Sequence, residues 1–175
     1  MEAEQMDLAR YIRQIPDWPK KGILFRDITP LLADSKAFAA AVKQLCKDFK
    51  NAAVDCVAAV EAREFIFGSA AAVELGAGFI PIRKKGKLPG ATESITYDLE
   101  YGQDSLEVHK DSIEKGAKVL MVDDLLATGG TMAAACELMK KLGGEIAGIA
   151  FLIELSDLEG RDKLKGYDLH VLMTF

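Results

Sequence analysis

The sequence predicts an α/β protein with an open parallel β-sheet flanked by helices, and two observations carry this prediction. Short, continuously apolar segments have the length and composition of buried strands, and they lie at 56–60, 78–82, 118–124, 146–155 and 168–173. Segments in which apolar residues recur at helical spacing lie among them, at 65–75 and 131–143. Strands that alternate with helices are typical of a parallel sheet covered on both faces.

Length and charge narrow the class of protein. At 175 residues the chain is long enough for one well-buried domain and short for two, so we expect a single domain over 1–175. No apolar run approaches the ~18–20 residues of a membrane span, and we expect no membrane partner. The net charge of −5 disfavours binding to nucleic acid, which selects basic surfaces. Three widely spaced cysteines and an N-terminus without signal-peptide character predict a cytoplasmic location.

The first third of the chain is less regular. Apolar residues at helical spacing predict a helix over 4–14, which Pro16 ends. Segment 16–30 contains three prolines and one glycine and is expected to be irregular. An Asp-Ser pair then offers an N-cap for a helix that runs to about Phe49.

Helical spacing also disappears between Arg83 and Lys118. Segment 84–94 combines cationic residues with glycine and proline, and we expect a mobile loop there. Segment 95–109 is expected to form a hairpin that turns at Gly102.

The segment VLMVDDLLATGGTMAAA (119–135) reads as a strand, two carboxylates, a turn and a helix. In open parallel sheets, ligands bind at the carboxyl ends of the strands, where this turn falls. Asp123 and Asp124 would repel a phosphate, so they suit hydroxyls or a cation, as a ribose and its magnesium would supply. The turn opens a helix, and its backbone N–H groups and hydroxyls can hold a phosphate. Its residues are Ala127, Thr128, Gly129, Gly130 and Thr131.

Other phosphate motifs do not match this spacing. The P-loop pattern is absent, and the dinucleotide fingerprint fails because Gly129 and Gly130 are adjacent. A turn that only shapes the entry to the helix remains the alternative.

The stretch VLMVDDLLATGGT closely resembles the phosphoribosyl pyrophosphate (PRPP) signature of the type I phosphoribosyltransferase family. Five further segments resemble its adenine-specific members, in the family's order: DWPKKGILFRDITPLL (17–32), VEAREFIFG (60–68), RKKGKLPG (83–90), YDLEYG (97–102) and ELSDLEGRDKL (154–164). The resemblance covers nearly the whole chain. It implies a five-stranded parallel core, a small hood from 1–33, a flexible loop and hairpin over 83–109, and a magnesium-dependent homodimer. It also implies transfer of adenine onto PRPP, giving AMP and pyrophosphate in purine salvage.

The resemblance implies catalytic roles as well. Glu100, beside Tyr101, would belong to a loop that closes over the reacting carbon of the ribose. Its carboxylate would take part in proton transfer at the base and would stabilise the positive charge that develops on the ribose ring. Asp123 and Asp124 would hold the ribose hydroxyls, and the turn would hold the 5-phosphate. Without the resemblance, Glu100 reads as an ordinary exposed hairpin carboxylate.

Three cations are implied for the pyrophosphate. Arg63 and Arg83 suit it because a guanidinium pairs two oxygens at once, whereas Lys87 acts as a point charge. Mg²⁺ would enter with PRPP, and no side chain is assigned as its direct ligand. A solvated basic loop is the alternative for the lysines.

The base site follows from the same resemblance. Phe25 and Leu158 would sandwich the flat purine, while the backbone around Leu24 and Arg26 reads its edge. From the residues alone, Phe25 reads more simply as core. Two alternatives stay open: another purine as the base (hypoxanthine, guanine or xanthine), and a PRPP-sensing regulator, although this acidic chain lacks the basic face such regulators need.

The chain departs from the family pattern at two positions that usually hold glycine, Ala59 and Glu64. Ala59 is a mild change. Glu64 adds an anion beside Arg63, at a place where the backbone would use the conformational freedom of glycine. We expect either that its side chain points to solvent or that it weakens PRPP binding.

Overall fold

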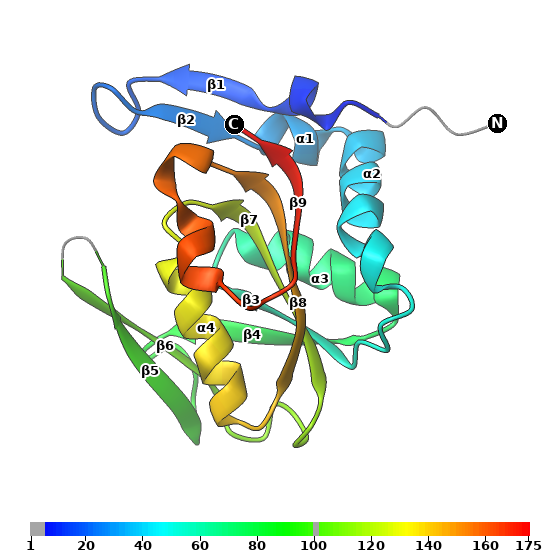
Figure 1. Ribbon diagram of the computed structural model, residues 1–175, viewed down its shortest axis with the longest axis vertical. Coiled ribbons are helices and arrows are strands. Elements are labelled where there is room, and N and C mark those ends of the chain that lie inside the picture. The colour runs from blue at the N-terminus through cyan, green and yellow to red at the C-terminus, as the bar shows by residue number, and fades with distance from the viewer. Residues whose placement is uncertain (1–5, 100–101) are drawn as a thin grey trace. The chain divides into compact units, whose positions relative to one another are not determined.

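The computed structural model describes residues 6–99 and 102–175 (Figure 1). Backbone contacts divide the chain into two compact units, Met1–Gln44 and Leu45–Phe175. The expectation of a single domain over 1–175 therefore stays a prediction.

The N-terminal unit contains a two-stranded antiparallel sheet and short helices. Its elements are η1 (Leu8–Tyr11), β1 (Arg13–Pro16), β2 (Leu24–Asp27), α1 (Thr29–Ala33) and most of α2 (Ser35–Cys46). The helix expected over 4–14 is wrong beyond the single turn of η1. An isolated helix of that length is marginal, and the pairing of β1 with β2, as in Ile15 with Phe25, satisfies the backbone instead. The expected irregular segment 16–30 likewise contains β2.

The larger unit is built on a seven-stranded sheet of order β5-β6-β4-β3-β7-β8-β9. Its strands are β3 (Cys56–Val60), β4 (Gly78–Lys84), β5 (Thr92–Asp98), β6 (Gln103–His109), β7 (Lys118–Leu126), β8 (Glu145–Glu154) and β9 (Leu169–Thr174). The five strands from β4 to β9 in this order pair in parallel, which confirms the expected core. β5 and β6 add an antiparallel extension at the β4 edge.

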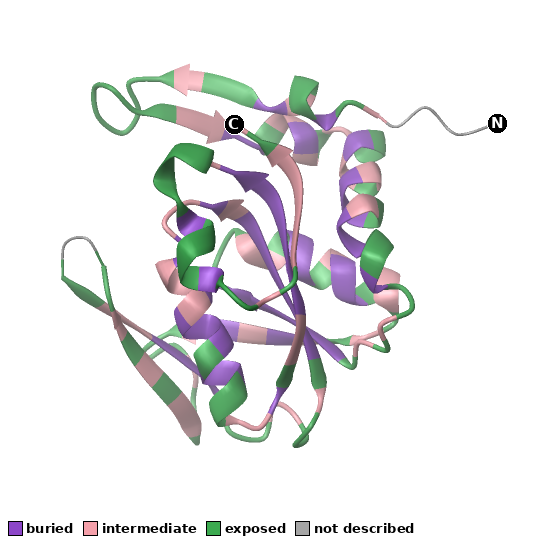
Figure 2. Ribbon diagram, viewed as in Figure 1, coloured by how far each residue is buried: buried purple, intermediate pink, exposed green. Residues whose placement is uncertain are grey.

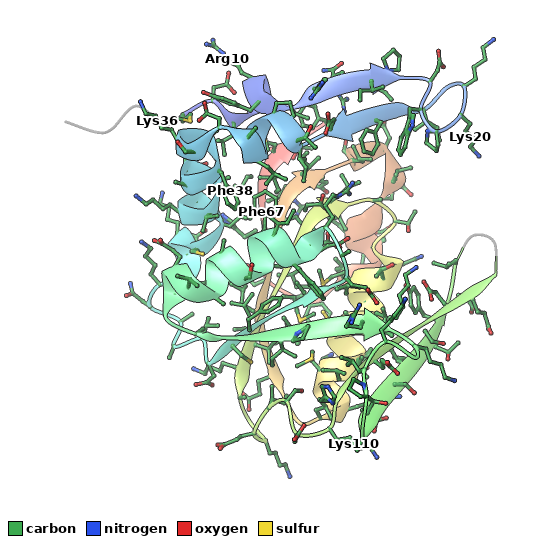
Figure 3. All side chains as sticks on the ribbon, turned by 180° about the vertical axis from the view of Figure 1, so that it is seen from behind. Arg10, Lys20, Lys36, Phe38, Phe67 and Lys110 are labelled. Carbon is green, nitrogen blue, oxygen red and sulfur yellow. The ribbon has the colours of Figure 1, made fainter. Side chains whose placement is uncertain are left out.

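Helices cover both faces of this sheet. α4 (Gly130–Lys141) lies in front of the sheet in Figure 1 and α3 (Glu64–Leu75) behind it, and the reverse view of Figure 3 agrees. β3, β7 and β8 are almost wholly buried, as Figure 2 shows, because helices pack on both sides. Phe67 on α3 and Phe151 on β8 are among the largest fully buried side chains (Figure 3 labels Phe67). Three short 3-10 helices complete the unit: η2 (Lys47–Phe49), η3 (Ser156–Leu158) and η4 (Gly160–Leu164).

Packing explains why Ala59 is a mild departure from the family pattern. Ala59 is fully buried on β3, opposite Gly68 of α3. A Cβ added to Gly68 would lie 2.7 Å from the Ala59 methyl group, closer than carbon atoms pack. The methyl group therefore fills the space that the helix glycine leaves open.

The hairpin expected over 95–109 is confirmed as β5 and β6, with Asp98 opposite Gln103. Gly102 has a φ of +94°, which glycine adopts without strain, and its carbonyl accepts a hydrogen bond from Leu99 N–H (2.9 Å). Glu100 and Tyr101 lie outside the described residues. Within the part of the chain described here, no helix is both long and apolar enough to cross a membrane.

Candidate functional site

The end of β7 carries two buried carboxylates. Asp123 is 8% exposed and Asp124 only 1%. Asp123 Oδ1 accepts a hydrogen bond from Leu125 N–H (3.2 Å). Burial raises the pKa of Asp123 well above its ordinary value, and the charges of Asp124 and Glu64 raise it further. The carboxylates at this end of β7 therefore repel one another, which favours the protonated form of Asp123.

Arg63 offsets part of this charge. Its Nε contacts Asp124 Oδ2, and its second guanidinium nitrogen lies 3.3 Å from Oδ1, so the pair is bidentate. Burial by itself lowers the pKa of Arg63, but the charge and hydrogen bond of Asp124, together with the charges of Glu64 and Asp123, outweigh it and the pKa is raised. The Arg63 side chain is 42% exposed against 2% for Asp124, so the arginine is partly accessible to solvent while its partner is not.

Glu64 begins α3 and joins the two aspartates. One carboxylate oxygen from each of Glu64, Asp123 and Asp124 lies within 4.8 Å of the others. Glu64 Oε2 is buried and has no hydrogen-bond partner among the described residues. Burial is the largest cause of the raised pKa of Glu64, and the negative charge of Asp124 raises it further. Of the two alternatives for Glu64, the structure contradicts the side chain that points to solvent, because its Oε2 is buried. The expected need for glycine is also wrong, since Glu64 is helical and not among the described residues with positive φ.

The turn after β7 leaves donors free. Gly129 is the N-cap of α4 with a φ of +76°, and no side chain caps the helix. The first N–H groups of α4 therefore remain available to an anion, at the positive end of the helix dipole. Tyr97 Oη lies 3.2 Å from Thr131 Oγ1, which ties strand β5 to this turn.

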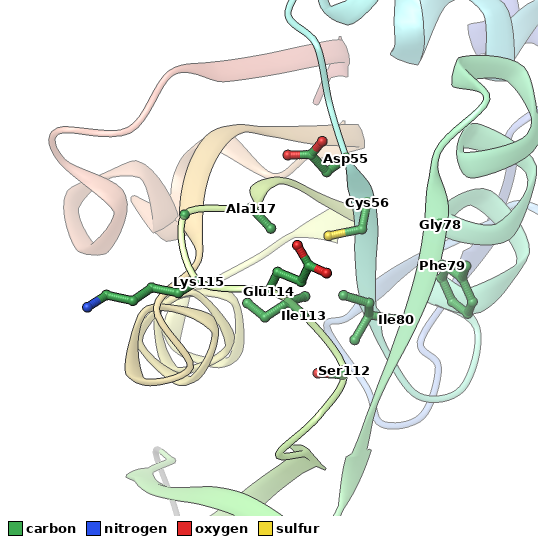
Figure 4. A pocket seen from close by; sticks show the side chains of 11 residues that line it. Asp55, Cys56, Gly78, Phe79, Ile80, Ser112, Ile113, Glu114, Lys115 and Ala117 are labelled. Carbon is green, nitrogen blue, oxygen red and sulfur yellow. The ribbon is translucent and has the colours of Figure 1, made fainter.

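The carboxylates and the turn line one cavity of about 170 Å³. Its walls also include Arg63 and Glu64. A larger hollow of about 450 Å³ lies at the opposite, amino-terminal edge of the sheet (Figure 4). There Cys56 and Ile80 form part of the lining, and Lys115 extends away from the hollow. Only the smaller cavity joins buried carboxylates to a helix N-terminus, so we take it as the functional site.

Other residues predicted for the site lie outside that cavity. Arg83 donates to Glu61 Oε2 (3.0 Å) and to the Lys87 carbonyl (3.3 Å), and neither Arg83 nor Lys87 lines the cavity. Leu158 is 45% exposed in η3. Leu24, Phe25 and Arg26 form β2, where the Phe25 ring lies 4.4 Å from that of Trp18.

Sequence reasoning missed the carboxylates that hold the segment after β4. Glu61 Oε1 accepts from Lys84 N–H (2.6 Å), and Glu107 Oε1 accepts from the N–H groups of Lys87 (3.0 Å) and Leu88 (2.8 Å). The N–H of Leu88 is the main cause of a lowered pKa at Glu107. Glu107 alternates with Leu106 and Val108 in a hairpin strand, so the sequence pattern indicates an outward-facing residue and gives no signal of its pairing.

Comparison with known proteins identifies the family of this chain. The model of the phosphoribosyl transferase domain family matches residues 28–173. An adenine phosphoribosyltransferase of Halothermothrix orenii is 54% identical over 168 residues, covering 96% of this chain and 99% of that protein. The chain belongs to the adenine phosphoribosyltransferase family. A crystal structure of the Thermoanaerobacter pseudethanolicus adenine phosphoribosyltransferase superposes with a TM-score of 0.92 at 53% identity, covering 97% of this chain and 98% of that one.

A more distant member bears on the ligands of adenine phosphoribosyltransferases. The Saccharomyces cerevisiae enzyme, 37% identical with a TM-score of 0.87 and covering 95% of this chain and 96% of its own, was crystallised with adenine and an imino-altritol bisphosphate. That complex combines a purine with a ligand that carries two phosphate groups on one sugar-like ring.

Proposed function

We propose that this chain transfers the 5-phosphoribosyl group of PRPP to adenine, forming AMP and pyrophosphate in purine salvage. The observation that carries the proposal is the single cavity in which Asp123 and Asp124 face the helix-opening turn. A phosphorylated ribose needs these two surfaces side by side, because its phosphate seeks N–H donors and its hydroxyls seek carboxylate acceptors. Family membership over nearly the full length supports the same reaction.

In this proposal the turn 127–131 binds the 5-phosphate, and its hydroxyls add donors. Asp123 and Asp124 accept hydrogen bonds from the 2- and 3-hydroxyls of the ribose. N9 of adenine attacks C1 of the ribose as the bond from C1 to the pyrophosphate oxygen breaks, and the N9 proton passes to the carboxylate proposed for Glu100. The nearby carboxylates stabilise the positive charge that develops on the ribose ring during this exchange.

The pyrophosphate is assigned to Arg63, Arg83 and Lys87. Arg63 already stands at the cavity, paired with Asp124. Arg83 and Lys87 belong to the segment that Glu61 and Glu107 hold. Closure of this segment over the bound substrate would bring both cations to the pyrophosphate. Glu100 and Tyr101 keep their proposed place in the closing loop, where the carboxylate of Glu100 accepts the proton that the base loses.

Mg²⁺ is proposed to bind together with PRPP. PRPP would supply most of its ligands, and no side chain is assigned as a direct ligand, although the carboxylates of Asp123 and Asp124 offer the oxygen atoms that Mg²⁺ prefers. Bound with the pyrophosphate, Mg²⁺ would neutralise charge on the leaving group.

The base is proposed to stack between Phe25 and Leu158, with the backbone at Leu24 and Arg26 reading its edge. The exposure of Leu158 leaves an apolar surface available to a purine. The decisive assay supplies PRPP and Mg²⁺ with adenine, hypoxanthine, guanine or xanthine, and follows nucleotide formation. Faster turnover of any 6-oxo purine would refute the choice of base, and no nucleotide from any base would refute the enzyme and leave the PRPP-sensing alternative.

We also propose a homodimer that works in the cytoplasm. α3 leaves Ile66 38% and Val73 83% exposed, an apolar surface that a second copy could bury. Cys46, Cys56 and Cys136 are free thiols, as a reducing compartment maintains. Sedimentation of the purified chain tests the dimer, with substitution of Val73 by lysine as the disrupting variant.

A further inference from the structure

Residues 155–160, which follow β8, pack backbone to backbone against residues 127–131, here called the phosphate turn. A Cβ added to Gly129 would overlap the carbonyl oxygen of Gly160, and one added to Gly160 would overlap that of Ala127. Leu155 N–H, at the start of the same segment, donates to the Leu126 carbonyl (2.9 Å). The position of the turn therefore depends on the position of residues 155–160.

An ion pair between a buried glutamate and a partly exposed arginine fixes this segment. Glu154, the last residue of β8, is 6% exposed, and its two oxygens accept from Arg161 Nε (2.6 Å) and from a terminal guanidinium nitrogen (2.7 Å). This hydrogen bonding is the main cause of the raised pKa of Arg161. A bidentate pair sets orientation as well as distance, because both nitrogens must align with one planar carboxylate. Arg161 directly follows Gly160, so the pair fixes the residue that touches the turn.

The same segment carries Leu158. Leu158 ends η3, and Glu159 after it has a φ of +51°, an unusual backbone conformation for a residue other than glycine. Such a conformation persists only where surrounding contacts impose it. The Glu154–Arg161 ion pair joins two residues that lie on either side of Glu159 in the sequence. Leu158 and Gly160 are thus held on opposite sides of one constrained residue.

We propose that Arg161 is a positioning residue that couples the base subsite to the 5-phosphate subsite through segment 155–161. Through Glu154 it holds Gly160 against the phosphate turn and, in the same rigid segment, holds Leu158 where the base stacks. The inference rests on the proposed function for the role of Leu158 and of the turn. Arg161 itself does not line the cavity assigned to the ribose and its phosphate.

The test compares Arg161→Gln with Lys165→Gln, a matched control in the same stretch whose ion pair with Asp162 is exposed. Binding of AMP, ribose 5-phosphate and adenine is measured by calorimetry well below the melting temperature of each variant. Arg161→Gln should weaken AMP binding by ~10–100-fold, the scale on which a small misplacement of binding groups acts, and should raise KM for both substrates. Lys165→Gln should bind like the wild type. A lower melting temperature with unchanged affinities would reduce Arg161 to a purely structural role and overturn the proposal.

Two more variants keep the test decisive if Arg161→Gln does not fold. Arg161→Lys retains a charge but not the planar fork, so its AMP affinity should fall between those of the wild type and the Gln variant. Gly160→Ala leaves the ion pair intact and places a methyl group against the Ala127 carbonyl. Its affinities for ribose 5-phosphate and adenine should fall together, and a fall in only one of them would contradict coupling. Wild-type turnover is measured separately, so a failure of the proposed activity is distinguishable from a failure of this inference.

Discussion

Arg63 and Asp124 form a bidentate ion pair, although their proposed roles lie on different parts of PRPP. Asp124 is almost wholly buried, whereas Arg63 is partly exposed and can reorient. A pyrophosphate that attracts Arg63 would release Asp124 to accept the hydroxyls of the ribose. The pair therefore keeps a buried carboxylate from standing alone, which would be costly in a site of this charge.

Asp124→Asn should lower turnover by ~10–1000-fold, the range for losing one preorganised electrostatic group. The amide keeps the shape of the side chain but removes the charge that both Arg63 and the developing positive ribose need. Steady-state kinetics with adenine and PRPP measure the effect, and circular dichroism checks that the variant is folded. Asp111→Asn, at an exposed turn, is the control. Undiminished turnover in Asp124→Asn would remove Asp124 from the mechanism.

The sequence was sufficient for the parallel core and for the turn that opens α4, because both depend on local patterns. Apolar strands such as 56–60 need burial on two faces, and the turn at Gly129 needs small residues in consecutive positions. The Arg63–Asp124 pair could not be predicted, because it joins residues 61 positions apart whose separation only the register of β3 beside β7 determines. The β1–β2 hairpin was missed because the periodicity of 4–14 fits a helix, while tertiary pairing decides its fate.

The carboxylates that accept hydrogen bonds from neighbouring segments show the same limit. Glu61, Glu107 and Glu154 look like ordinary surface residues in the sequence, yet each accepts two hydrogen bonds from a neighbouring segment. No spacing rule connects them to their partners. Their function is to position loops, and only three-dimensional contacts reveal it.

The segment from Arg83 to the hairpin should become protected when ligands bind. Lys84, Lys85 and Lys87 are exposed, and the segment is held mainly through backbone contacts to Glu61 and Glu107, so brief opening would admit trypsin. PRPP with a nonreacting adenine analogue should slow cleavage there by closing the loop.

Mass spectrometry of timed digests locates each cut. Cleavage after Lys115, on a loop at the other edge of the sheet, serves as the internal control and should not change. Equal rates at Lys84–Lys87 with and without ligands would argue against closure.

The three cysteines should be unreactive in the folded protein. Burial raises the pKa of Cys46 and of Cys56 to about 11, and that of Cys136 to about 12. The reactive thiolate is then scarce at neutral pH. A pKa raised by folding also means that the related stability is complete below the ordinary thiol pKa and is lost as pH rises through 11 to 12.

A thiol reagent with a coloured product should therefore detect no fast-reacting cysteine at pH 8 and all three in denaturant. Cys56, at 6% exposure beside the hollow of Figure 4, should be the first to react as the pH is raised. Rapid labelling of Cys46 or Cys136 in the folded protein would contradict their burial.

Glu64 stands where the resemblance leads us to expect glycine, and the structure separates two reasons why this difference could matter. The backbone at Glu64 is helical, so strain from a positive φ does not contribute. Charge does contribute, because the carboxylate lies within 4.8 Å of those of Asp123 and Asp124 in the cavity assigned to PRPP. At about 4 Å, repulsion between two like charges is about 1 kcal/mol in water and several times that when solvent is excluded.

Removing this charge should therefore tighten PRPP binding by roughly three- to thirtyfold, since each 1.4 kcal/mol is about tenfold, with adenine affinity little changed. Glu64→Gln and Glu64→Gly should act alike, because both remove the charge and no strain is relieved by glycine. Glu74→Gln, at the other end of α3, controls for a change of charge on the same helix. PRPP is titrated against each variant at one fixed concentration of Mg²⁺. If the glycine variant alone gained affinity, backbone freedom rather than charge would be the cause, and if neither gained, Glu64 would be neutral toward PRPP.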